Sequence, residues 1–234
     1  MNASMTWRVL TWNILGAQHP PLEQVAAHIR HCRPDVVALQ EVRRRQAHRL
    51  ARLLGWRVVW RAKHYPYGPL VWWTAEGLAV LAPTPLSEPT RRILSVGEPL
   101  WIHRRRIMVS ATVTRADGAT LRVHDLHLAT GSADERTAQA RRAALAARAE
   151  AHSNMVLCGD FNSVDEPATL DQLTSAGVRD AGGPSTNPSE APYQRLDYVL
   201  VPTAAEVLSV DTPEGGDTWR AISDHLPVLV EFRP

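Results

Sequence analysis

The stretch Val156-Leu157-Cys158-Gly159-Asp160-Phe161-Asn162 is an apolar run that ends in an acid and an amide. Side chains alternate between the two faces of a strand, so Asp160 and Asn162 point the same way. A carboxylate in an apolar strand is costly to bury unless it is paired, hydrogen-bonded or bound to a cation. This run therefore predicts a buried strand that presents polar groups at its end.

The same pattern recurs where other apolar runs meet polar residues. These runs are 9–13 ending in Asn13, 36–41 ending in Gln40 and Glu41, 123–127 with Asp125 and His127 on one face, 196–199 around Asp197, and 226–232 preceded by Ser223-Asp224-His225. Several such acids need one shared explanation, and hard divalent cations such as Mg²⁺ bind carboxylates, water and substrate phosphate. Asparagine and histidine beside them can hold phosphate oxygens and move protons.

Length and composition favour one ordinary globular unit. The chain has 234 residues, and we expect residues 1–234 to form a single domain. A formal net charge of +2 permits a phosphate-bearing partner without requiring one. We find neither a signal-peptide pattern nor an apolar run near the roughly 20 residues that cross a bilayer, so we expect a cytoplasmic monomer. Cys32 and Cys158 lie far apart in apolar stretches, which favours free thiols over a disulfide.

Periodicity predicts a few helices among many strands. Apolar residues at helical spacing predict a helix from Leu22 to Ile29, a second covers 44–54 with Gly55 after it, and a third begins at Ser132 with Glu135 completing a capping box. Strands are expected at 7–14, 35–40, 56–61, 77–81, 106–114, 120–128, 155–161, 196–201 and 226–232. Asp117-Gly118 predicts a hairpin. The mixture favours two packed mixed sheets with helices outside.

Five short motifs resemble those of the endonuclease/exonuclease/phosphatase superfamily. They are Thr11-Trp12-Asn13-Ile14, Leu39-Gln40-Glu41-Val42, Gly159-Asp160-Phe161-Asn162, Leu196-Asp197-Tyr198 and Ser223-Asp224-His225-Leu226-Pro227-Val228. Each motif alone is weakly specific, but the ordered set, spanning Trp7 to Phe232, is specific. The resemblance implies an α/β fold, a four-layer α/β/β/α sandwich of two packed mixed β-sheets, with the site at one end of the sheets.

The resemblance also implies a metal site and a substrate site. Glu41 is the leading metal ligand, and Asn13 and Asp224 lie near the same cation or its waters. Asp160 and Asn162 orient the attacking water and a phosphate oxygen and join the possible metal ligands. The implied cation is Mg²⁺, with Mn²⁺ or Ca²⁺ as alternatives. Substrate phosphate is expected to contact the set Asn13, Asn162, His127 and Arg43.

Two residues share the proton transfers in this resemblance. Asp197 orients His225, which moves a proton or stabilises the pentacovalent phosphorus, and His127 contacts phosphate or assists the leaving group. Either Asp160 or His225 serves as the general base, and the sequence does not decide between them.

The chain departs from the family pattern at two places. Asp125 stands where the family often has Asn, which adds a negative charge beside the expected phosphate site. Ala82-Pro83 stands where many members have Ser-Arg, so we expect a phosphate-contacting arginine to be missing there.

The resulting hypothesis is a metal-dependent phosphodiesterase acting on nucleic acid. Arg43-Arg44-Arg45 could extend a cationic track from the site. The alternative is a lipid or inositol phosphoesterase similar to bacterial sphingomyelinases, in which the aromatic stretch 64–73 meets a membrane surface. A non-catalytic binding module of the same fold is a third hypothesis, and the complete motif set argues against it.

Overall fold

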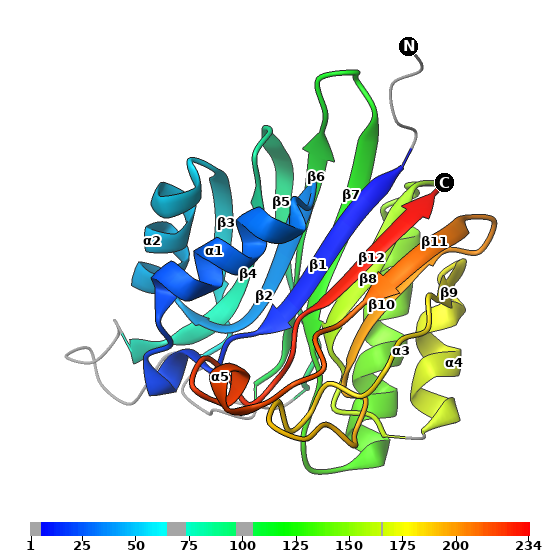
Figure 1. Cartoon of the computed structure of the whole chain (residues 1–234). Helices are drawn as coiled ribbons and strands as arrows, with labels where there is room; N and C mark the ends of the chain where they lie inside the picture. Colours follow the sequence, from blue (N-terminus) through cyan, green and yellow to red (C-terminus); the bar gives the residue numbers. More distant parts are fainter. Residues whose placement is uncertain (1–5, 65–73, 97–104, 165) are drawn as a thin grey trace.

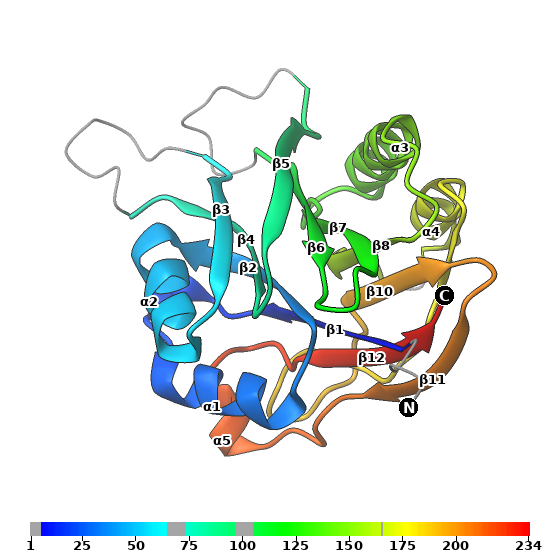
Figure 2. The ribbon, with the colours of Figure 1, turned by 90° about the horizontal axis from the view of Figure 1, so that it is seen from above.

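The computed structural model describes residues 6–64, 74–96, 105–164 and 166–234, which form four layers (Figure 1). Two six-stranded sheets pack face to face at the centre, and helices cover their outer faces, as Figure 2 shows from above. The expected sandwich of two packed mixed sheets with helices outside is thereby confirmed.

The first sheet brings the ends of three neighbouring strands to one edge. Its strands are β1 (Trp7–Asn13), β2 (Val36–Arg43), β3 (Arg57–Ala62), β4 (Glu76–Ala82), β11 (Glu206–Asp211) and β12 (Val228–Arg233), in the order β11-β12-β1-β2-β4-β3. β1 and β2 run parallel and pair Asn13 with Gln40. β12 runs antiparallel to β1, so the chain just after His225 enters the sheet at the same edge. This edge is at the lower end of the sheets in Figure 1.

The second sheet places three predicted site residues side by side. Its strands are β5 (Leu86–Ile93), β6 (Ile107–Thr114), β7 (Thr120–His127), β8 (Met155–Asp160), β9 (Val178–Asp180) and β10 (Asp197–Pro202), in the order β5-β6-β7-β8-β10-β9. β7 and β8 run parallel and pair His127 with Asp160. β8 and β10 run antiparallel and pair Asp160 with Asp197.

The three expected helices are present, with short additional ones. The helices are α1 (Leu22–Cys32), α2 (Arg44–Leu54), α3 (Ala133–Ala149), α4 (Pro167–Thr174) and α5 (Asp217–Arg220), with a 3-10 turn η1 (Gly16–Gln18). Gly55 ends α2 in the left-handed region, where glycine has no steric penalty. Ser132 Oγ accepts the backbone N–H of Glu135 at the start of α3, which is one half of the expected capping box.

Three hydrophobic layers separate the four layers of secondary structure. The central layer lies between the sheets and includes Val9, Ala38, Val109, Val123 and Val230. A second packs α1 and α2 on the first sheet through Leu10, Val25, Ile29, Leu39 and Leu50. A third packs α3 and α4 on the second sheet through Leu126, Ala140, Ala144, Leu157 and Leu173. Side-chain alternation along each strand thus feeds two cores, and polar residues replace apolar ones only near the strand ends.

Two further expectations concern the cysteines and membrane spans. Cys32 and Cys158 are free thiols, as expected. Among the residues that the structure describes, no helix is long and apolar enough to cross a membrane.

Candidate active site

Asp160 is the centre of a polar group at the common end of both sheets. Its Oδ2 accepts a hydrogen bond from Asn13 Nδ2 at 3.0 Å, and its Oδ1 accepts one from the backbone N–H of Asn162 at 3.0 Å. Two histidines face the same carboxylate, with His127 Nε2 at 3.6 Å and His225 Nε2 at 3.9 Å from Oδ2. Burial raises the pKa of Asp160 to about 6, although the charge of His225 opposes the shift.

Asp197 holds the ring of His225 from the other side. Its Oδ2 lies 2.8 Å from His225 Nδ1 and accepts a second hydrogen bond from Thr186 Oγ1 at 2.6 Å. Burial on its own would lower the pKa of His225, but the charges of Asp197 and Asp160 outweigh burial and raise that pKa to about 10. The ring is therefore an imidazolium at neutral pH, and each of its nitrogens faces a carboxylate.

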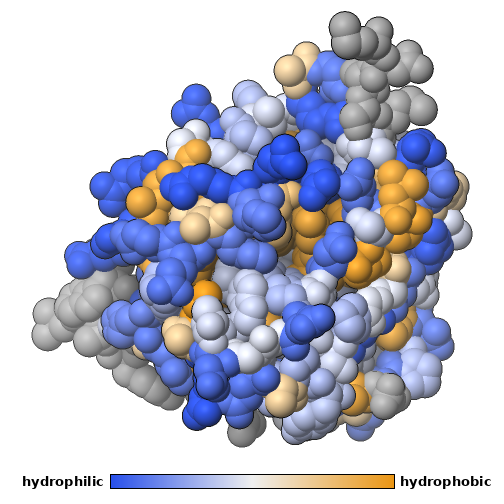
Figure 3. Space-filling model, viewed as in Figure 1, coloured by the Kyte–Doolittle hydropathy of each residue, from blue (hydrophilic) through white to orange (hydrophobic). Residues whose placement is uncertain are grey.

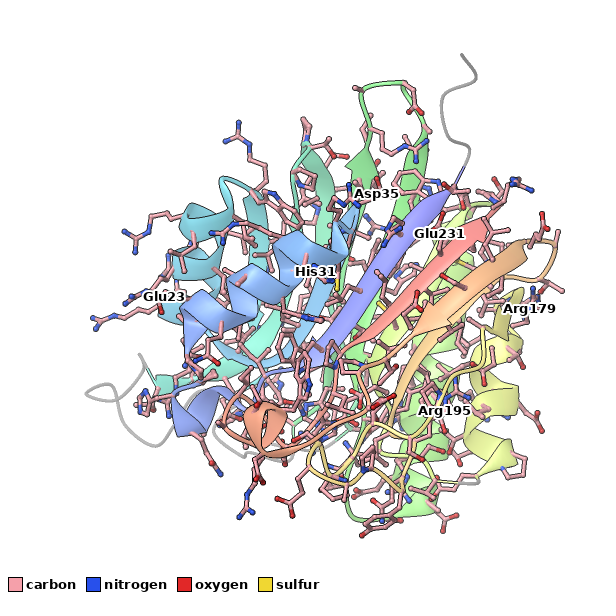
Figure 4. The ribbon with its side chains drawn as sticks, in the orientation of Figure 1. Glu23, His31, Asp35, Arg179, Arg195 and Glu231 are labelled. Carbon is pink, nitrogen blue, oxygen red and sulfur yellow. The ribbon has the colours of Figure 1, made fainter. Side chains whose placement is uncertain are left out.

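Thr186 is a positioning residue that the sequence did not reveal. It lies in the segment 181–196, which has no helical or strand periodicity. Arg195, labelled in Figure 4, anchors this segment through two hydrogen bonds to Asp180, at 2.7 and 2.6 Å, and lies over the ring of Tyr198. The anchored segment carries the Thr186 hydroxyl to Asp197, so that the orientation of the carboxylate is fixed.

The main chain around His225 is bonded to the end of β1. Trp12 Nε1 donates to the carbonyl oxygen of His225 at 2.9 Å. Ser223 Oγ donates to the carbonyl oxygen of Asn13 at 2.6 Å and accepts the backbone N–H of His225 at 3.2 Å. These bonds couple the loop before β12 to β1, and they explain why Trp12 and Ser223 belong to the motifs although neither faces the site.

Glu41 sits on an irregularity of β2. The pairing of β2 with β4 shifts between Leu39 and Val42, and Glu41 adopts a left-handed backbone with φ 53°. Such a conformation costs a non-glycine residue about 1–3 kcal/mol and persists only where the surroundings impose it. Gly16 packs against this bend: a Cβ at that position would lie 2.2 Å from the carbonyl oxygen of Glu41. The irregularity turns the Glu41 side chain toward the site.

The Glu41 carboxylate has unused bonding capacity. Its side chain is 21% exposed, and its Oε1 lies 3.8 Å from His127 Nε2. Burial raises its pKa, while the charge of Lys63 opposes that shift and the charge of Asp224 adds to it. None of the residues that the structure describes donates a hydrogen bond to this carboxylate. Asp224 is exposed, and its main-chain oxygen accepts the N–H of Ser189, so its carboxylate lies at the mouth of the site.

Asn162 and Arg43 lie at the margin of the group. Asn162 has a left-handed backbone, φ 50°, and its Nδ2 donates to the carbonyl oxygen of Leu128 at 3.1 Å. Arg43 is half-buried before the first turn of α2, with Nη1 3.4 Å from His19 Nε2. The structure thus gathers the remaining predicted residues around Asp160 and leaves these two beside them.

Comparison with known proteins gives the family of the chain. The sequence profile of the Endonuclease/Exonuclease/phosphatase family matches residues 10–225. The chain belongs to this family. Among curated proteins none matches the chain, whereas many solved structures do.

Three solved structures illustrate the likeness. An endonuclease/exonuclease/phosphatase from Beutenbergia cavernae is 25% identical, with a TM-score of 0.75 over 97% of this chain and 71% of its own. A mannosyl-6-phosphatase from Bacteroides thetaiotaomicron is 18% identical, with a TM-score of 0.77 over 97% and 99% of the two chains. The human Nocturnin catalytic domain with bound sulfate anion is 20% identical, with a TM-score of 0.76 over 99% and 96%.

Family membership makes this protein a phosphoesterase of a family that typically uses a divalent metal. The residues present fit such a cation, because Glu41 offers a carboxylate without a donor and Asp224 lies near it. Asp160, Asp197 and His225 also bring one ligand atom each within 4.8 Å of one another. Since Asp197 Oδ2 already accepts two hydrogen bonds and His225 is protonated, that trio suits proton transfer better than metal binding.

The two departures from the family pattern have different structural consequences from those expected. Asp125 is fully buried below the site and bonded through Oδ1 to Gln40 Nε2 at 2.7 Å. Burial raises its pKa well above the usual range, so it adds no negative charge. Ala82 lies at the end of β4 that is remote from Glu41, because β4 runs antiparallel to β2. An arginine there would not reach the site.

Two sequence features lie wholly or partly outside the described residues. The aromatic stretch 64–73 is described only at His64. Of the triplet 104–106, Arg105 and Arg106 are described, and both are buried rather than solvated.

Proposed function

We propose that this protein hydrolyses phosphodiester bonds of nucleic acid, with water as the nucleophile and Mg²⁺ as the bound cation. Mn²⁺ and Ca²⁺ are the alternatives, because they accept the same oxygen ligands. Glu41 would hold the cation, with Asp224 and Asn13 near it or its waters. The cation would polarise a phosphate oxygen and favour attack at phosphorus.

The geometry around Asp160 divides the proton transfers between its two neighbours. Asp160 takes the proton from water as the new oxygen–phosphorus bond forms, since its carboxylate faces the site and is held by Asn13 and Asn162. His225 has Nδ1 committed to Asp197, so its Nε2–H stabilises charge on the phosphate oxygens as the bond to the leaving oxygen breaks. His127 faces the same carboxylate and would contact the phosphate or the leaving oxygen.

The observation that carries a nucleic acid substrate is a basic surface leading away from the site. Arg43 lies two residues after Glu41, and α2 follows it with no acidic residue. The exposed basic residues of α2 are Arg44, Arg45, His48, Arg49 and Arg52, and those at the end of α1 are Arg30, His31 and Arg33. Figure 3 shows mostly hydrophilic side chains over these two helices. A row of cations matches the repeated charges of a phosphate backbone.

Lipid and inositol phosphates remain the alternative substrates. That hypothesis rests on the stretch 64–73, most of which lies outside the described residues, so no contact within the described part of the chain favours it. The mannosyl-6-phosphatase with a similar fold adds a sugar phosphomonoester to the substrates worth testing.

A substrate panel tests the proposal directly. DNA, RNA, a generic diester, a monoester and sphingomyelin are offered with Mg²⁺, Mn²⁺, Ca²⁺ or EDTA. We expect cleavage of DNA or RNA that EDTA abolishes. Cleavage of the monoester or of sphingomyelin without cleavage of nucleic acid would reject the proposed substrate, and no cleavage at all would leave the binding-module hypothesis.

The basic surface has its own test. The triple variant Arg44→Gln, Arg45→Gln and Arg52→Gln should weaken nucleic acid binding and flatten its dependence on salt by about 0.7–0.9 per lost phosphate contact. The matched control is Arg141→Gln with Arg148→Gln on α3, which lies on the opposite outer layer. Equal effects of both variants would show that only bulk charge matters.

A further inference from the structure

Two cationic side chains are buried at the same end of the sheets as the active site. Lys63 directly follows β3, and Arg106 directly precedes β6. Each is only 6% exposed. A buried cation is costly unless a partner compensates it, so the partners of these two residues decide their role.

Arg106 has no such partner. Its Nε is fully buried without a hydrogen bond, and none of the residues that the structure describes accepts a bond from its guanidinium. Lys63 has one weak partner, since its Nζ lies 3.4 Å from Glu76 Oε2. A buried donor left unsatisfied in a native fold calls for an explanation such as a ligand.

Arg122 shows how this protein satisfies a structural arginine. Arg122 is buried in the same sheet as Arg106, and its Nε donates to Glu150 at 2.7 Å. Its Nη1 donates to the carbonyl oxygen of Glu88 at 2.8 Å and to Thr112 at 3.1 Å. Since a structural role provides acceptors of this kind, their absence around Arg106 argues against a purely structural role.

Strand register places both cations beside the site. β6 and β7 pair Met108 with Leu126, so Arg106 lies across from Leu128, the residue after His127. Lys63 continues β3 and accepts pairing with the first residue of β4, as its backbone N–H donates to the carbonyl oxygen of Glu76. Residue 76 in turn pairs with Arg43, two residues from Glu41. The two cations therefore flank the site on its Glu41 and His127 side.

The electrostatics agree with this placement. Burial lowers the pKa of His127, and the charges of Arg106 and Lys63 lower it further. Burial also lowers the pKa of Arg106, and Asp160 is the foremost charged group that opposes this shift. Both cations thus act on the groups that face the substrate.

We propose that Lys63 and Arg106 form an anion subsite that binds the oxygens of a substrate phosphate beside Glu41 and Asp160. This subsite rests on the phosphoesterase function and deepens it, because it assigns charge recognition to two residues outside the family motifs. Arg106 supplies several N–H donors in a planar fork, which suits a phosphate, and Lys63 adds a point charge.

Binding of inorganic phosphate in the presence of Mg²⁺ tests the subsite without requiring any particular substrate. Arg106→Gln and Lys63→Met should each weaken the phosphate Kd by about tenfold or more, the size expected for a lost charge-assisted hydrogen bond. Arg106→Lys should retain part of the affinity, and Arg57→Gln, at the far end of β3, should leave it unchanged. Unchanged phosphate affinity in both of the first two variants would overturn the subsite.

Thermal unfolding separates this role from a structural one. Arg106→Gln should unfold at the same or a higher temperature than the native protein, because the substitution removes a buried charge without a partner. For Lys63 the double variant Lys63→Met with Glu76→Gln avoids leaving Glu76 unpaired. A lower unfolding temperature for Arg106→Gln would indicate that the guanidinium holds the fold together and would overturn the assignment.

Two dinucleotide substrates then identify which phosphate is bound. One carries a terminal phosphate in addition to the scissile one, and the other lacks it. If the subsite takes the scissile phosphate, Arg106→Gln lowers kcat/KM equally on both; if it takes the neighbouring one, only the preference for the phosphorylated substrate is lost. Failure of the native protein to cleave either dinucleotide would count against a nucleic acid substrate, while the phosphate-binding result would still stand.

Discussion

The imidazole of His225 lies between two carboxylates, with Nδ1 2.8 Å from Asp197 Oδ2 and Nε2 3.9 Å from Asp160 Oδ2. Asp197 and Asp160 are direct cross-strand partners on β10 and β8. The ring is thus fixed by one acid while it faces the other. A small rotation of Asp197 would turn Nε2 away from the substrate position.

The first prediction concerns this orientation. Asp197→Asn keeps the shape of the side chain but removes the charge that holds His225 protonated at Nδ1, so we expect kcat to fall by about 10²–10⁴-fold. KM should change much less. Steady-state kinetics with a phosphodiester substrate measure both.

Thr186 provides a graded control for the same relationship. Thr186→Val removes one hydrogen bond to Asp197 but keeps its charge, so its loss of kcat should be smaller than that of Asp197→Asn. Thr186→Ser retains the hydroxyl and should restore most of the activity. A Thr186→Val enzyme as impaired as Asp197→Asn would show that the hydroxyl acts on something other than this carboxylate.

The second prediction concerns pH. Because burial raises the pKa of Asp160 to about 6, its carboxylate is ionised above that pH and protonated below it. Protonated Asp160 cannot accept a proton from water, so kcat/KM should decline about tenfold per pH unit below about 6. A pH–rate profile from 4.5 to 8 measures this. Asp160→Asn should be nearly inactive throughout, and a native profile flat down to pH 5 would contradict the assigned role.

Most site residues were predictable because they end apolar strands. Asn13, Asp160 and Asp197 interrupt runs whose other side chains are buried, and the cost of burying such groups makes them conspicuous. Thr186 was not predictable, since it lies in an irregular segment and acts through a hydrogen bond fixed only by tertiary packing. Lys63 escaped notice for the same reason.

The strands that sequence reasoning missed share one property. β5, β9 and β11 each lie at the edge of a sheet, where one side of the strand has no neighbour. Their burial is partial and irregular, so they carry neither the continuous apolar run of a central strand nor a clean alternation. Arg195 and Asp180, which anchor the segment after β9, gave no pattern either.

The third prediction concerns the cation. A ligand that binds only the folded protein stabilises it by about 2.7 kcal/mol at a concentration one hundred times its Kd. Saturating Mg²⁺ should therefore raise the unfolding temperature, and EDTA should reverse the rise. Glu41→Gln should remove most of the Mg²⁺-dependent shift while it leaves the unfolding temperature in EDTA nearly unchanged.

His225→Ala is the matched comparison for the cation. Because His225 is not expected to bind the metal, this variant should lose turnover and still show the Mg²⁺-dependent rise in unfolding temperature. If instead the shift disappears with His225→Ala and persists with Glu41→Gln, the cation lies in the group of Asp160, Asp197 and His225.

The fourth prediction concerns the stability contributed by Asp125. Burial raises its folded-state pKa well above 3.8, so the folded protein keeps a proton that the unfolded chain loses above about pH 4. A raised folded-state pKa gives stability that is present below the unfolded pKa and is lost as pH rises toward the folded pKa. Native Asp125 therefore costs stability progressively from about pH 4 toward neutral and alkaline pH.

Asp125→Asn should remove this cost. The new amide can still accept the bond from Gln40 Nε2, and its N–H₂ supplies a donor where Gln40 Oε1 has no partner. We expect the variant to gain about 1–3 kcal/mol in free energy of unfolding at pH 7.5 and little at pH 4.5. Urea unfolding at the two pH values measures this difference, with the exposed Asp171→Asn as a control that should show no such pH dependence. A difference between Asp125→Asn and the native protein that stays constant with pH would mean that Asp125 is ionised in the folded state after all.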